Sequence, residues 1–114
     1  MTLIKPLLHG YLDYLTAAVF LLSPSLLALT DAARQLAYVL GSIYLVMTLI
    51  TNFPLGVLKI IAFRIHGRIE SLLGPALLLG HFMFKNDNVS HNFYLTISIA
   101  IIALRLLTDY EETR

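Results

Sequence analysis

The chain has 114 residues, of which 58% are hydrophobic and only 13% are charged, and its net charge is +1. Soluble domains carry about 25% charged residues, so a soluble helical bundle of this composition would expose large apolar patches, and a single membrane-embedded domain is favoured. The low charge without a basic patch argues against nucleic-acid binding, and the absence of cysteine excludes disulfides and thiolate chemistry.

Long stretches without charged residues predict four membrane-spanning helices. A helix needs about 20 residues to cross the hydrocarbon core. We place the spans near residues 10–29, 34–52, 67–84 and 90–108. Thr30 and Asp31 predict the start of the second helix, the sequence 52–54 (Asn-Phe-Pro) predicts its end, and residues 85–88 predict a turn-rich polar loop.

The segment 54–66 is too short and too charged to cross a membrane. Its residues Leu55, Leu58, Ile61 and Ile65 fall near one helical face, which predicts an interfacial helix lying flat on the membrane. A plain loop is the alternative. The expected fold is therefore all-α, a polytopic membrane protein with four transmembrane helices in two tandem hairpins and an interfacial helix between them.

Lysine and arginine are distributed unequally between the two sides that four spans define. One side holds Lys5, Lys59, Arg64, Arg68, Arg105 and Arg114, and the other holds Arg34 and Lys85. Because positively charged loops stay in the cytoplasm, both termini are expected on the cytoplasmic side.

An internal repeat is predicted at an offset of 57 residues, relating residues 1–53 to residues 58–110. The offset aligns His9-Gly10 with His66-Gly67, Asp13 with Glu70, and Thr51-Asn52-Phe53 with Thr108-Asp109-Tyr110. Each half contains two spans, so the halves run in the same direction across the membrane. The polar positions of both halves are therefore expected at one end of the bundle, on the cytoplasmic side.

The paired His-Gly-x-x-acid motifs at His9 and His66, Ser23-Pro24, and Pro54 after the second span resemble the SPW-repeat group of small bacterial membrane proteins. The resemblance covers nearly the whole chain and implies a four-span fold in the bacterial inner membrane. Two positions differ from the group: Ser25 replaces its tryptophan, and Gly80-His81 stands where a second Ser-Pro is expected. The resemblance supplies no functional residue to transfer.

Two histidine–carboxylate pairs are the candidate functional site. His9 and Asp13 are four residues apart, as are His66 and Glu70, and this spacing places both members of a pair on one helical face. Two imidazoles and two carboxylates suit zinc or another divalent metal, and without a metal the same groups could relay protons. Thr51, Asn52, Arg105, Thr108 and Asp109 are the supporting residues at the same end.

The leading hypothesis is a membrane module that binds a cation or proton at these pairs, with transport as its extension. The alternative is a structural or accessory subunit in which each pair only anchors its hairpin, since acids are favoured in the first turn of a helix. A haem between His9 and His66 is disfavoured because both residues lie at helix ends beside an acid. No enzyme is expected, although metal-assisted hydrolysis stays open.

Small residues predict close helix packing. Ala33, Ala37 and Gly41 in the second span, and Ala76 and Gly80 in the third, are spaced by four residues. Such faces let helices approach closely in lipid, either within one chain or between two chains of a homodimer. The lipid bilayer is the other expected partner.

Overall fold

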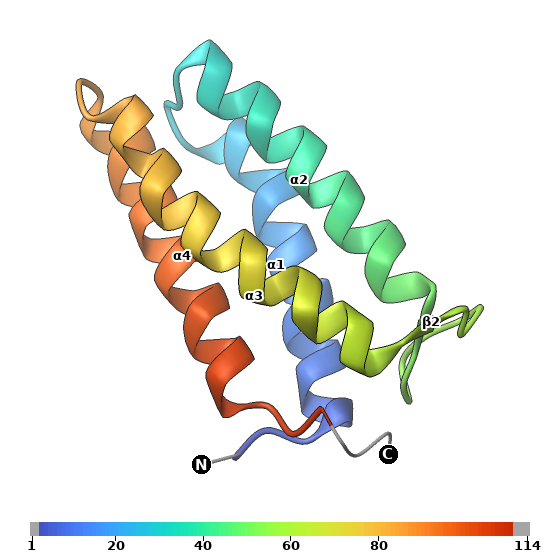
Figure 1. Cartoon of the computed structure of the whole chain (residues 1–114). Helices are drawn as coiled ribbons and strands as arrows, with labels where there is room; N and C mark the ends of the chain where they lie inside the picture. The colour runs from blue at the N-terminus through green and yellow to red at the C-terminus, as the bar shows by residue number, and fades with distance from the viewer. Residues whose placement is uncertain (1–2, 111–114) are drawn as a thin grey trace.

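The computed structural model describes residues 3–110, and within them four long helices form two antiparallel hairpins (Figure 1). The first hairpin pairs α1 (Pro6–Leu26) with α2 (Asp31–Leu49), and the second pairs α3 (Phe63–Gly80) with α4 (Asn88–Leu107). The remaining elements are the strands β1 (Thr51–Asn52) and β2 (Ile61–Ala62) and the 3₁₀ helix η1 (His81–Phe84). The all-α prediction is confirmed, with a very small two-stranded sheet added to it.

Each long helix begins earlier than the span predicted for it, by four, three, four and two residues in chain order. α1 starts at Pro6, because proline fits the first turn of a helix, where its missing N–H would have no partner. His9 therefore lies inside α1 rather than before it. The predicted cap of α2 is confirmed, since the Thr30 hydroxyl accepts a hydrogen bond from the Ala33 amide at 3.2 Å.

The predicted interfacial helix over residues 54–66 is wrong. This segment turns back on the end of α2, and its amides bond the last helical carbonyls: Val57 and Leu58 donate to Leu49, and Ile60 and Ile61 donate to Ile50. β2 then pairs with β1 in parallel, and α3 begins only at residue 63. Amides already used in this way cannot form a separate helix, so the segment caps α2 instead.

The two halves of the chain place equivalent elements at equal spacing. α1 and α3 begin at residues 6 and 63, and α2 and α4 begin at residues 31 and 88. The bridge of Ile61 with Thr51 has a counterpart in the bridge of Ile4 with Thr108. All these positions are related by the 57-residue offset of the predicted repeat. As a result, the starts of α1 and α3 and the end of α4 lie at one end of the bundle (Figure 1).

Two of the described helices, α2 and α4, are long and apolar enough to cross a membrane, with mean hydropathies of 1.3 and 1.4. α1 and α3 have similar lengths, 21 and 18 residues, but carry the histidines and acids of the candidate site. The candidate site therefore lowers the hydropathy of the two helices that contain it. Four spans stay a prediction.

The surface of the long helices is rich in large apolar side chains, and several polar and charged side chains are buried beside an apolar core. Large aliphatic residues on every long helix are exposed, among them Leu15, Val39, Leu72 and Ile99. The buried set, by contrast, includes these polar and charged residues: His9, Asp13, Ser23, Thr48, Thr51, His66, Glu70, His81, Ser90, Ser98 and Thr108. An apolar core that includes Phe20, Ala37, Tyr44, Leu77 and Tyr94 fills the rest of the interior.

Gly41 sets the closeness of α1 and α2. A Cβ atom at this position would lie 2.7 Å from Leu21 Cγ and 2.9 Å from Phe20 Cβ, so Gly41→Ala must push the helices apart. We expect a loss of about 1–2 kcal/mol, because overpacking outweighs the gain in helix propensity. Gly80→Ala is the matched control, since a Cβ there meets nothing within 4 Å. Thermal unfolding should show a lower Tm for the first variant only, and equal Tm values would contradict the account.

A short network joins the two hairpins at the end opposite the candidate site. Asp87 caps α4 by accepting hydrogen bonds from the Ser90 hydroxyl at 2.6 Å and the Ser90 amide at 3.0 Å. The same Ser90 hydroxyl oxygen accepts the Thr30 amide at the start of α2. Asp87 therefore supports α4 directly and the contact between hairpins through Ser90.

The contribution of Asp87 to stability should depend on pH. The hydrogen bonds from the Ser90 side chain and backbone hold the pKa of this carboxyl below its ordinary value. The stabilisation is therefore fully present above the pKa of the unfolded state, about 3.9, and is lost as pH falls through the lower folded-state pKa. We expect the Tm difference between wild type and Asp87→Ala to be constant from pH 7 to pH 5 and to shrink near pH 3. An unchanged difference at pH 3 would contradict this assignment.

Candidate metal centre

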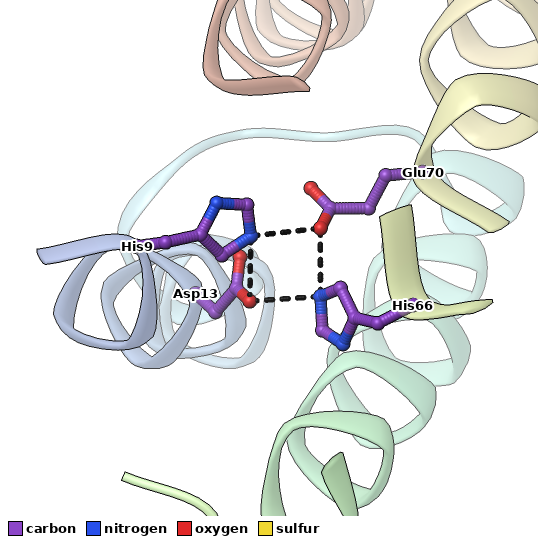
Figure 2. Close-up of side chains that lie close together, drawn as sticks. All are labelled: His9, Asp13, His66 and Glu70. Atoms are coloured by element: carbon purple, nitrogen blue, oxygen red, sulfur yellow. Dashed lines mark hydrogen bonds and ion pairs between the residues drawn. The ribbon is translucent and has the colours of Figure 1, made fainter. Parts of the chain in front are cut away.

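Four titratable side chains from α1 and α3 meet inside the bundle, and we refer to His9, Asp13, His66 and Glu70 as the cluster (Figure 2). All four are fully buried, at 0% exposure. Each offers one ligand atom, and these atoms all lie within 4.8 Å of one another. The i,i+4 spacing within each helix and the side-by-side placement of the two helix starts bring the two pairs together.

The four ligand atoms alternate nitrogen and oxygen around a ring (Figure 2). His9 Nε2 lies 2.8 Å from Glu70 Oε1 and 3.1 Å from Asp13 Oδ2. His66 Nε2 lies 2.6 Å from Glu70 Oε1 and 2.9 Å from Asp13 Oδ2. Tetrahedral zinc with bonds of about 2.0 Å separates its ligand atoms by about 3.3 Å, so these four nitrogen–oxygen distances would each need to widen, by between about 0.2 and about 0.7 Å.

Two threonine hydroxyls determine which nitrogen of each imidazole carries the proton. His9 Nδ1 lies 2.7 Å from Thr108 Oγ1, and that hydroxyl donates its own hydrogen to the Leu104 carbonyl. The Thr hydroxyl must therefore accept from His9, so Nδ1 is the protonated nitrogen.

The same arrangement holds the second imidazole. His66 Nδ1 lies 2.8 Å from Thr51 Oγ1, whose hydrogen is donated to the Met47 carbonyl. Each histidine is thus oriented by a threonine from the other half of the chain. In the neutral imidazole the remaining nitrogen, Nε2, carries a lone pair, and both Nε2 atoms face the carboxylates.

Two members of the cluster, His66 and Asp13, lack hydrogen bonds at the atoms that face the other members. His66 Nε2 and both carboxylate oxygens of Asp13 are buried, and no described residue hydrogen-bonds them. The short contacts between His66 Nε2 and the acids therefore lack the alignment of a donor and an acceptor. His9 Nε2, by contrast, hydrogen-bonds Glu70 Oε1 at 2.8 Å. Buried polar atoms without a partner are costly, and one cation held between His66 Nε2 and the carboxylates would supply the missing partner.

Glu70 has more support than Asp13. The hydroxyls of Tyr44 and Tyr110 donate to its two carboxylate oxygens, at 3.3 Å and 3.4 Å. Burial, reinforced by the nearby carboxylates, raises the pKa of the Tyr110 hydroxyl, so it remains a proton donor. These bonds hold Glu70 in place, whereas the contacts of Asp13 with described side chains are those with the two imidazoles.

Aromatic rings enclose the cluster. Phe63 and Tyr110 pack edge-on against the His9 ring, with centroids 5.2 Å and 5.3 Å away. Phe53 stacks on Phe63 at 5.2 Å. The His9 and His66 ring centroids are themselves only 5.5 Å apart, which leaves no space for a haem between them. The enclosure lowers the local dielectric and strengthens any charge interaction within the cluster.

The predicted supporting residues have different places. Thr51 and Thr108 contact the cluster, as described above. Asn52 is exposed in β1, and the Asp109 amide donates to the Ile4 carbonyl at the edge of the site. The Arg105 Nε donates to the Gly67 carbonyl and the Ser71 hydroxyl rather than to an acid of the cluster.

Tyr44 was missed in the sequence. Its counterpart at the 57-residue offset is Ile101, so the repeat gives no polar match there. His81, by contrast, lies at the other end of the bundle, where it contacts the Leu78 carbonyl and the His91 ring.

Comparison with protein-family models, with curated proteins and with solved structures finds no match to this chain. The resemblance to the SPW-repeat group therefore stays a prediction from the sequence, and the function must be argued from the site itself.

Proposed function

We propose that this chain is a small integral membrane protein whose cluster binds one divalent cation, zinc or a metal of similar softness. One observation carries the proposal: the two threonines hold both imidazoles with Nδ1 protonated, so that both Nε2 atoms converge on the two carboxylates. In metal sites, such outer hydrogen bonds fix the tautomer and direction of the ligating histidines.

The large apolar side chains exposed on the long helices support the membrane location. Exposed leucine, isoleucine and valine on all four long helices would form large apolar patches in water, whereas lipid accepts them. α1 has 21 residues and is about 31 Å long, close to the thickness of the hydrocarbon core. In membrane proteins, buried acids and histidines face the bundle interior, as these do.

The charges and the donor set support a divalent cation. Two ionised carboxylates and two neutral imidazoles carry a net charge of about −2, which one divalent ion neutralises within the apolar interior. Zinc accepts both imidazole and carboxylate ligands in a four-coordinate site. Magnesium and calcium prefer oxygen ligands alone, and copper(I) prefers sulfur, which the cluster lacks.

The structural alternative is a proton-filled site. Protons on both Nε2 atoms would make two imidazolium–carboxylate pairs that only anchor the hairpins to each other. That arrangement also balances charge, but it leaves His66 Nε2 and Asp13 without aligned hydrogen bonds. Both accounts predict a stabilising cluster, and they differ in the effect of added metal.

A metal-binding experiment on the full chain separates the two accounts. We expect protein purified in detergent, stripped with chelator and reloaded, to retain one zinc per chain by elemental analysis. Its Tm should rise by several degrees with zinc in excess over the dissociation constant, because a ligand of the folded state stabilises it. Magnesium at the same concentration is the control and should have no effect. No retained zinc and no shift would favour the anchoring account.

A further inference from the structure

A second feature lies directly beside the cluster, on the outer face of the α3–α4 hairpin. A cavity of about 190 Å³ is lined by Glu70, Ser71, Pro75, Ile102, Arg105 and Leu106. Glu70 belongs to the cluster, and the half-buried Arg105 brings a permanent positive charge. Pro75, Ile102 and Leu106 make the rest of the wall apolar.

Arg105 is held in a fixed orientation by hydrogen bonds from its Nε atom, on one side of the guanidinium group. Its Nε donates to the Gly67 carbonyl at 2.9 Å and to the Ser71 hydroxyl at 2.5 Å, and its central carbon lies 4.6 Å from the centre of the Tyr110 ring. Within residues 3–110, no acid lies within ion-pair distance of Arg105, and no acceptor bonds its two terminal amino groups. No described residue therefore occupies these amino groups.

The charge of Arg105 is not neutralised by the neighbouring acid. The Glu70 oxygens face both imidazoles and two tyrosine hydroxyls, and within residues 3–110 no ion pair joins Glu70 to Arg105. An arginine that no described acid neutralises is costly in a membrane protein, where such residues are usually paired. Its planar fork of donors matches a phosphate group particularly well.

This site belongs to the second half of the chain only. At the 57-residue offset, Arg105 corresponds to Thr48 and Ser71 corresponds to Tyr14. Thr48 is uncharged and fully buried, and the Tyr14 hydroxyl donates to the Leu55 carbonyl. In the second half, the small Ser71 stands where the first half has the large Tyr14, which provides space. The cationic Arg105 stands where the first half has the neutral Thr48, which provides the charge for an anion.

We propose that this cavity binds a phosphate group through the terminal amino groups of Arg105. Arg105 lies two residues before the end of α4, at the end of the bundle where phospholipid headgroups would lie if α4 spans a membrane. The apolar wall suits the glycerol and acyl portion of a phospholipid, and a soluble phosphate is the other source of the same chemistry. The inference rests on the proposed membrane embedding but not on metal binding.

The test is thermal unfolding of the detergent-purified full chain with three probes. We expect phosphatidylglycerol to raise the Tm by about 3 °C or more, and diacylglycerol, which lacks the phosphate, to have no effect. Arg105→Gln should abolish the shift, and Arg34→Gln, at the opposite end, should retain it. An Arg105-dependent shift with inorganic phosphate would also support the site and would identify a soluble ligand as its source.

Two further variants protect the test against a folding defect in Arg105→Gln. Arg105→Lys keeps the charge but loses the fork, so a smaller shift is expected. Leu106→Trp keeps Arg105 and fills the cavity mouth from an exposed position, so the shift should disappear. Equal shifts in wild type, Arg105→Gln and Leu106→Trp would overturn the proposal. Zinc content measured on the same samples reports separately on the cluster.

Discussion

Replacing His66 by alanine is expected to abolish the stabilisation of this protein by zinc. The variant removes one of two nitrogen ligands and the partner of both carboxylates, so affinity for zinc should fall by more than about 100-fold. Without metal, the variant should also be less stable by about 3–5 kcal/mol, because it leaves buried acids with one imidazole. His9→Ala should behave in the same way, since His9 contacts the same two oxygens.

The measurement is the Tm of each variant with zinc and with chelator. His81→Ala is the matched control, because His81 is also buried but lies at the other end of the bundle. It should keep the full zinc shift. The anchoring account predicts a different result: His66→Ala would lower the Tm, and zinc would change neither protein.

The second large effect is expected from Thr51→Val and Thr108→Val, which leave all four ligands in place. Each variant removes the hydroxyl that accepts the Nδ1 proton of one histidine. That imidazole can then shift its proton to Nε2, the nitrogen that faces the carboxylates. Zinc affinity should therefore fall about 10–100-fold for each variant, because this is the usual effect of removing an outer-shell partner of a metal ligand.

Competition with a chelator of known zinc affinity would measure this effect. Thr16→Val is a suitable control, since the Thr16 hydroxyl makes the same kind of backbone hydrogen bond, to the Leu12 carbonyl, without contacting a histidine. Its zinc affinity should be that of wild type. Equal affinities in all three variants would show that the threonines do not orient the metal ligands.

The members of the cluster could be predicted from the sequence because their chemistry is repeated. His9 and Asp13 have counterparts in His66 and Glu70 at one offset, and the matching Thr51 and Thr108 mark the ends of the adjacent helices. Polar residues in an apolar chain are few, so each match is informative. The tautomer arrangement, by contrast, depends on hydroxyl contacts across the two halves, which the sequence does not reveal.

The errors concern groups whose environment is set by backbone contacts. The segment 54–66 has an amphipathic pattern, yet its amides bond the carbonyls of Leu49 and Ile50, which a hydrophobic pattern cannot indicate. The early start of α1 was also missed, since the predicted span began at residue 10, whereas the helix extends back to Pro6.

X-ray absorption at the zinc edge, on protein loaded with one zinc per chain, tests the central claim most directly. The cluster predicts a four-coordinate ion with two imidazole nitrogens and two carboxylate oxygens at about 2.0–2.2 Å. The imidazole signal should be halved in His66→Ala samples that still retain metal. A zinc ion with no imidazole ligand, or one whose surroundings are unchanged by His66→Ala, would contradict the assignment.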